Sequence, residues 1–278
     1  MSVSTAAPVR PATTPAGDPS DVARPVTLRR VVRAESIKFW TLRSTVGVLA
    51  AAVIGMVAIA MIVALNTRKL TGDVQLEDVL PSATLQGYYL GQLLIGALGV
   101  LFVTGEYSTG MIRSTLAAVP KRLPVLVAKL LVFLAVVATA MLAASVVAFL
   151  GAQALLGHYR TGFSLGDPGV LRVVLGTGIY LTLVGVIGMA IGWIVRSTPG
   201  SLVTYIAVVL VVPGIFSSVL GSWGRHIAQY MPSQAGASFS TSLHLPPSLS
   251  PWVGLGVMVL WTVAGLVVAV LSLLRRDA

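Results

Sequence analysis

Long apolar runs dominate the pattern of hydrophobic and polar positions along this chain. A helix needs about 20 residues to cross a bilayer, and six of these runs have about that length. They cover 45–65, 85–103, 125–150, 173–195, 201–220 and 252–274. Lipid cannot satisfy backbone donors and acceptors, so each run is expected to be a helix. The second run is the most diluted, because Gln86, Gln92 and glycines interrupt it. The pattern predicts an all-α polytopic membrane protein with six transmembrane helices.

The residues before the first span divide into two parts. Residues 1–27 are rich in Pro, Ala, Thr and Ser and lack the contiguous apolar region of a signal peptide. They are expected to form a disordered tail ahead of a six-span domain over 28–278. Residues 28–43 resemble a basic amphipathic helix, a type that lies in the membrane interface. Its apolar face consists of Leu28, Val31, Val32, Phe39 and Leu42.

Glu35 falls in the middle of this apolar face, where a carboxylate is unexpected. One interpretation is that the side chain snorkels to solvent at the edge of the helix. The alternative is that Glu35 is buried and meets a partner charge from elsewhere in the protein. The sequence leaves both open.

The distribution of charge predicts how the chain sits in the membrane. With the N-terminus inside, 14 of the 19 Lys and Arg residues face the cytoplasm and 5 face outward. Cytoplasmic loops carry the excess of basic residues, so both termini are expected to be cytoplasmic. The same bias accounts for the net charge of +10 without nucleic acid, since no basic region is interleaved with aromatic residues as single-strand binders require.

The connection between the second and third spans, 104–122, concentrates charge in a chain with only 10% charged residues. Ser108 or Thr109 can cap a helix, Pro120 ends it, and Gly105 and Gly110 allow a sharp turn out of the preceding span. Between them, an apolar stripe consists of Met111, Ile112, Thr115, Leu116 and Val119. Such a helix either rests on lipid headgroups or docks into a groove on a cytoplasmic partner.

The amino-acid sequence of this connection favours docking on a partner, because it resembles the sequence of a known family of membrane proteins. The stretch E-Y-S-T-G-M-I-R-S-T-L-A-A-V-P-K-R resembles the cytoplasmic loop of ABC type-2 transporter permeases. The matching positions are Glu106, Gly110, Arg113, Pro120, Arg122 and Lys129. The segment A-E-S-I-K-F-W, with Glu35 and Lys38, is similar to the helix that precedes the first span in this family. Met111 departs from the family, which more often carries Thr at that position.

The resemblance implies a function and a set of site residues. In this family the loop holds a coupling helix that seats on a separate ATP-binding cassette ATPase. The residues carried over to that role are Glu106, Gly110, Met111, Ile112, Arg113, Leu116 and Val119. A cytoplasmic polar cluster of Glu35, Lys38, Glu106 and Arg113 is also implied. The chain would be the permease subunit of an exporter in the bacterial cytoplasmic membrane, a homodimer or heterodimer among membrane lipids. Because the spans offer an apolar surface without fixed charges, lipophilic drugs, antibiotics or lipids are the expected cargo.

Other chemistry has little support in the sequence. The chain has no cysteine, no G-x-x-x-x-G-K-[ST] phosphate loop and no H-E-x-x-H or G-x-S-x-G motif, so we expect no enzyme activity, cofactor or metal site of its own. The rival hypotheses are a secondary transporter and a non-transporting membrane partner protein. Ion-coupled carriers place ionisable residues inside the membrane. The six span cores hold none, and Lys129 lies near enough to a span end to snorkel.

Three smaller features carry structural expectations. Gly185, Gly188 and Gly192 share one side of the fourth span and favour close packing within the chain over a dimer face. Pro213 should disturb the fifth span, because it removes a backbone hydrogen bond. The aromatic-containing segment 221–251 would, by the resemblance, form short re-entrant helices on the outer side.

Overall fold

A computed structural model of the chain describes residues 27–70, 82–118, 122–156, 163–242 and 248–275. Throughout these ranges the regular structure is helical, without a strand. Six helices are long and apolar enough to cross a membrane: Arg43–Thr67, Tyr88–Ser108, Arg122–Leu156, Val170–Val195, Thr198–Ser218 and Pro251–Arg275. The prediction of an all-α polytopic membrane fold with six spans is confirmed. The predicted disordered tail lies outside the described residues except for Thr27.

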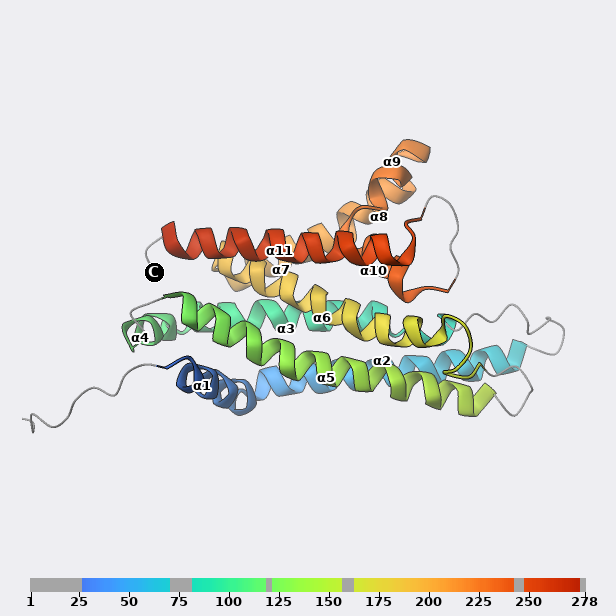
Figure 1. The fold of residues 1–278 in the computed structure, drawn as a ribbon, viewed down its shortest axis with the longest axis horizontal. Helices are drawn as coiled ribbons and strands as arrows, with labels where there is room; N and C mark the ends of the chain where they lie inside the picture. Colours follow the sequence, from blue (N-terminus) through green and yellow to red (C-terminus); the bar gives the residue numbers. More distant parts are fainter. Residues whose placement is uncertain (1–26, 71–81, 119–121, 157–162, 243–247, 276–278) are drawn as a thin grey trace, which may run out of the picture.

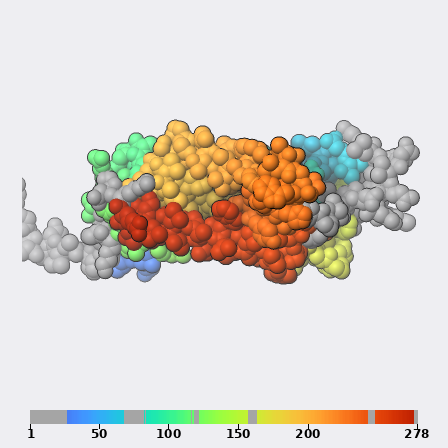
Figure 2. Space-filling view, turned by 90° about the horizontal axis from the view of Figure 1, so that it is seen from above, coloured from blue at the N-terminus to red at the C-terminus, as the bar shows by residue number. Residues whose placement is uncertain are grey.

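The long helices lie side by side along the longest axis of the molecule (Figure 1). They are α2 (Arg43–Leu70), α3 (Tyr88–Ser108), α5 (Arg122–Leu156), α6 (Val170–Val195), α7 (Thr198–Ile206) with its continuation α8 (Val212–Ser218), and α11 (Pro251–Arg275). In the most apolar stretch of α6, 72% of the residues are buried, against 22% in α11. Helix α6 is therefore the centre of the bundle. Figure 2 shows one of the outer faces, covered by α11 and the α7–α9 region.

Glycines bring α3 and α6 into backbone contact. A Cβ atom added to Gly99 would lie 2.0 Å from the carbonyl oxygen of Gly185, and one added to Gly188 would lie 2.3 Å from that of Gly96. Any side chain at these positions would push the two helices apart. The predicted internal role of the fourth-span glycines is confirmed, since they pack against α3 within the same chain.

The fifth span contains the predicted disturbance. A π-helical segment, Ala207–Val211, joins α7 to α8 immediately before Pro213. Proline cannot donate the backbone hydrogen bond of the preceding turn, so the ladder widens there. On the buried side of this span, Tyr205 donates a hydrogen bond of 2.6 Å to the carbonyl oxygen of Gln92 in α3.

The two ends of the bundle are built differently (Figure 1). At one end lie α1 (Leu28–Thr41), α4 (Met111–Ala118) and the C-terminal end of α11. At the other end lie α9 (Gly221–Ala228) and α10 (Pro232–Ser240). The described parts nearest the two termini therefore share an end with the 104–122 connection, as an even number of spans requires. That this end is cytoplasmic stays a prediction from the distribution of charge.

The described part of segment 221–251 contains two short helices, α9 and α10, while their re-entry into the membrane stays a prediction from the resemblance. Arg172 of α6 closes the end of α10, because its guanidinium donates hydrogen bonds of 2.8 Å and 3.2 Å to the carbonyl oxygens of Phe239 and Thr241. Trp223 and Tyr230 are exposed, whereas Phe239 is buried. Only the first two of these aromatic side chains are free to rest in a membrane interface.

Arginines also hold the C-terminal end of α11. Arg122 at the start of α5 donates to the carbonyl oxygen of Leu273 at 3.0 Å, and Arg196 at the end of α6 donates to that of Ser272 at 3.1 Å. The last carbonyls of a helix have no partner within it and carry partial negative charge, so two guanidinium groups stabilise this end. Arg196 itself has a left-handed backbone, with φ of 59°.

Candidate functional site

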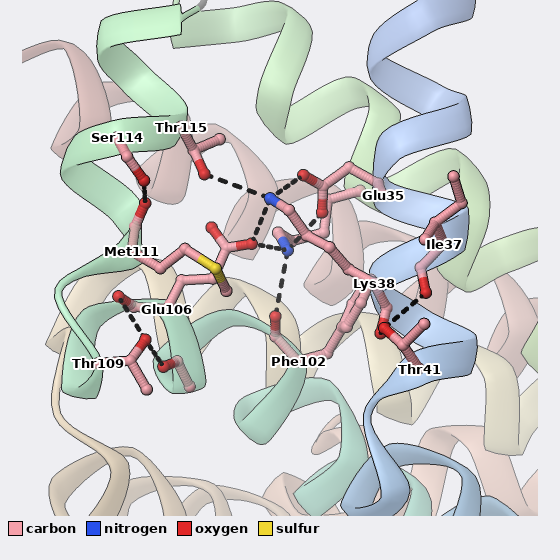
Figure 3. A network of polar contacts seen from close by, with 12 residues as sticks. Glu35, Ile37, Lys38, Thr41, Phe102, Glu106, Thr109, Met111, Ser114 and Thr115 are labelled. Atoms are coloured by element: carbon pink, nitrogen blue, oxygen red, sulfur yellow. Dashed lines mark hydrogen bonds and ion pairs between the residues drawn. The ribbon is translucent and has the colours of Figure 1, made fainter.

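Four ionisable side chains from three helices meet at the end of the bundle that contains α1 and α4 (Figure 3). Glu35 and Lys38 come from α1, Glu106 from the last turn of α3, and Lys129 from α5. We call these four residues the ion-pair cluster. They are far apart in the sequence, so the cluster exists only once the helices have packed.

Lys129 lies at the buried centre of the ion-pair cluster. Its ammonium nitrogen Nζ is 2.7 Å from Oε2 of Glu35, 3.1 Å from Oε1 of Glu106 and 3.3 Å from the carbonyl oxygen of Phe102. The same nitrogen lies 4.2 Å from the centre of the Phe102 ring, within reach of a cation–π interaction. An ammonium group has three N–H donors, and here each has an acceptor.

Lys38 completes the ion-pair cluster from its more open side. Its Nζ is 2.6 Å from Oε1 of Glu35 and 2.8 Å from Oε1 of Glu106, and it donates a 3.2 Å hydrogen bond to the hydroxyl of Thr115 in α4. Burial by itself would lower the pKa of Lys38, but the hydrogen bonds and negative charges of Glu106 and Glu35 outweigh it and raise that pKa above the ordinary value of a lysine. Lys38 therefore stays charged and connects α1, α3 and α4.

The ion-pair cluster is electrically balanced but sensitive to loss of a member. Its two carboxylates and two ammonium groups cancel, and the side chains of Glu35 and Lys129 are each only 1% exposed. Removing one member of a buried pair leaves an uncompensated charge, at a cost of about 3–5 kcal/mol. The arrangement acts as a rigid tie between helices and not as a surface salt bridge, which contributes little.

The sequence of α1 explains how Glu35 reaches this position. Val31, Glu35 and Phe39 are the buried residues of α1 and recur every four positions, so they form one face of the helix. Val31 packs with Val125 and Ala128 of α5. Of the two interpretations left open for Glu35, the structure supports the buried partner of a distant charge. The apolar face predicted for this helix packs against the protein at Val31 and Phe39 and not on lipid.

Lys129 corrects the expectation that it would snorkel. Its side chain is 1% exposed and points into the protein. The expectation concerned the span cores, and both charges lie near helix ends: Glu106 is in the last turn of α3, beyond the predicted run 85–103, and Lys129 is close to the start of α5.

The candidate coupling helix is α4, and Gly110 separates it from α3. Gly110 has a φ of 72°, a left-handed conformation that residues with a Cβ rarely adopt. Within α4, Ile112 is buried and joins the hydrophobic core, whereas Met111 is exposed. Arg113 is exposed and forms none of the ion pairs found among the described residues, so the structure does not bring it into the cluster predicted for it. The side chain of Leu116, and Val119 altogether, lie outside what the structure describes.

Two contributors to the site had no assigned role in the sequence analysis. Thr115 was placed only in the apolar stripe, yet its hydroxyl accepts the hydrogen bond from Lys38. Phe102 supplies both a carbonyl oxygen and an aromatic ring to Lys129. Neither role carries a signal in the sequence, because that of Thr115 depends on how α1 approaches α4 and that of Phe102 on how α5 approaches α3.

Comparison with known proteins adds no assignment. No family model matches the chain, and no curated protein is similar to it in sequence. Within the described ranges, no group of three His, Cys, Asp or Glu residues could hold a metal ion. The fold and the site define the class: an all-α, multi-pass integral membrane protein with a buried ion-pair cluster at one end.

Proposed function

We propose that this protein is the membrane-spanning permease subunit of an ABC type-2 transporter. A separate ATP-binding cassette ATPase would hydrolyse ATP, and the permease would move a lipophilic substrate outward. The observation that carries the proposal is the attachment of α4. This short helix follows a positive-φ glycine and is joined to α1, α3 and α5 through Lys38 and the ion-pair cluster.

The proposed coupling path begins at the exposed side of α4. Met111 and Arg113 face outward and are available to a partner, while Ile112 anchors the helix in the core. A push on α4 would pass through the Thr115–Lys38 hydrogen bond to Glu35 and Glu106, and through them to Lys129 in α5. Since the cluster resists separation, the helices would move together and not one at a time.

The outer faces of the bundle are compatible with a lipophilic cargo and with a second permease copy. On α11, exposed residues such as Leu260, Val263 and Val267 present an apolar surface. Type-2 permeases work as homodimers or heterodimers with two ATPase subunits, and we propose the same assembly here. The location of the protein in the bacterial cytoplasmic membrane, with both termini in the cytoplasm, is part of this proposal.

A pair of substitutions on α4 tests the docking step. Met111→Asp places a charge at an exposed apolar position and should release the ATPase, since apolar anchors in a groove cost about 2 kcal/mol or more when lost. Arg113→Ala removes an exposed charge on the same helix and should have the smaller effect. The measurement is co-purification of the ATPase in detergent at matched permease levels. An ATPase retained by Met111→Asp and lost by Arg113→Ala would overturn the proposed docking surface.

One observation favours a second candidate function, a proton-coupled secondary transporter. Glu106 and Lys129 are buried in membrane-spanning helices, where ionisable groups often form proton pathways. In that case the isolated chain in proteoliposomes would drive substrate flux from a pH gradient, without ATP or an ATPase. The permease proposal predicts no such flux.

A further inference from the structure

The outer face of α1 is unlike the face that packs against the bundle. Arg29, Arg33 and Trp40 are spaced by four and seven residues, so they lie on one stripe, opposite Val31, Glu35 and Phe39. All three outer residues are exposed, and the Trp40 side chain is 56% exposed. The helix therefore turns a basic and aromatic face away from the protein.

This face lies next in the sequence to the start of the first membrane-spanning helix. Helix α1 ends at Thr41, Leu42 is extended, and the first span begins at Arg43. Trp40, in the last turn of α1, is thus only a few residues from the start of the membrane-spanning segment. Tryptophan is enriched at membrane–water interfaces, where its ring meets the acyl boundary and its N–H meets water.

The charge on this face has no partner within the described part of the protein. The acidic residues there are Glu35, Glu106 and Asp167. The first two are engaged by Lys38 and Lys129, and Asp167 accepts a hydrogen bond from the backbone N–H of Ser164 between α5 and α6. No ion pair of Arg29 or Arg33 occurs among the described residues, so the described carboxylates do not neutralise these guanidinium groups.

We propose that the outer face of α1 binds the headgroup of an anionic phospholipid. Two guanidinium groups one turn apart can donate paired hydrogen bonds to phosphate oxygens, which a lysine ammonium does less well. A negatively charged leaflet attracts such basic segments next to a span, and the indole of Trp40 anchors the same helix beside the acyl chains. The opposite face of the helix holds Glu35 and Lys38, so a bound headgroup presses α1 onto the ion-pair cluster. This inference does not rest on the transporter assignment.

Native mass spectrometry of the full chain tests the proposal. The protein is reconstituted in nanodiscs of equal phosphatidylglycerol and phosphatidylcholine, and the lipids it retains on release are counted. We expect about a tenfold preference for phosphatidylglycerol, since basic residues near an anionic surface add their effects. Arg29→Gln with Arg33→Gln should remove most of this preference, and Arg29→Lys with Arg33→Lys should keep part of it.

Arg225→Gln is the matched control, because Arg225 is an exposed arginine on α9 at the opposite end of the molecule. It should leave the preference unchanged. No preference in the wild type, or a preference that survives the Arg29 and Arg33 glutamine substitutions, would overturn the proposal. If those substitutions instead release a co-purified ATPase from a wild type without lipid preference, the face binds an acidic protein surface and the lipid proposal is wrong.

Discussion

The two ends of this membrane protein share arginine–carbonyl hydrogen bonds but differ in their ion pairs. At the α1–α4 end, each ammonium nitrogen of Lys38 and Lys129 lies within 3.1 Å of an oxygen of Glu35 and an oxygen of Glu106, whereas no ion pair is found among the described residues of the other end. At the α9–α10 end, Arg172 donates to backbone carbonyls, and Gly236 lies against the ring of Tyr180. Losing one hydrogen bond to a carbonyl oxygen, or one packing contact, costs less than losing one member of a buried ion pair, which leaves an uncompensated charge. The ion-pair cluster therefore ties α1, α3 and α5 together more strictly than the contacts at the other end tie their helices.

The largest expected effect is that of Lys129→Ala. This substitution leaves Glu35 and Glu106 with Lys38 as the one remaining cation of the cluster, so one buried negative charge is uncompensated and the free energy of unfolding should fall by about 3–5 kcal/mol. Thermal unfolding in detergent, followed by circular dichroism, measures the loss. Leu131→Ala, at an exposed position on the same helix, is the control and should change little. A Lys129→Ala variant as stable as this control would show that the cluster is not a tie.

Gly110→Val should weaken the connection between α3 and α4. The φ of 72° forces a β-branched side chain into the left-handed region, at a cost of about 1–2 kcal/mol. We expect reduced ATPase co-purification while the spans stay folded. Gly256→Val, at a glycine of α11 with open space around it, makes the same chemical change without a positive φ. Equal effects of the two substitutions would contradict the role assigned to the Gly110 turn.

Arg172→Gln tests the opposite end. It removes a guanidinium that bonds the carbonyl oxygens closing α10, so unfolding should become easier by about 1–3 kcal/mol. Because this end has no part in the proposed docking, ATPase co-purification should not change. Loss of the ATPase from a folded Arg172→Gln variant would mean that the α9–α10 end affects docking at α4, which would contradict the independence of the two ends.

The smallest expected effect is that of pH. The pKa of Lys38 is raised in the folded protein, so its contribution to stability is complete below its ordinary pKa and is lost only as pH rises through the folded value. Between about pH 6 and about pH 9 the melting temperature should therefore show no transition from this group. A stability transition in that interval that disappears in Lys38→Met would contradict the assignment and favour the proton-coupled alternative.

The sequence predicts much of the fold because the apolar runs alone define six helices. Glu35, Lys38 and Glu106 were placed in one polar cluster by the resemblance, and the structure brings them together. The sequence could not predict the direction of the Lys129 side chain, since a long side chain near a span end can either snorkel or turn inward. For Arg113 the prediction was wrong. The resemblance placed it in the polar cluster, but it lies after the turn at Gly110 and is exposed.

The central claim is that the ion-pair cluster transmits movement from α4 to the spans, and Glu35→Gln tests it most directly. Glutamine keeps the shape and one acceptor oxygen but loses the charge that joins Lys38 to Lys129. The measurement is substrate transported per ATP hydrolysed by the reconstituted complex of permease and ATPase. We expect that the ATPase still binds and hydrolyses ATP while transport per ATP falls several-fold. An unchanged ratio, with the variant folded and the ATPase bound, would contradict it.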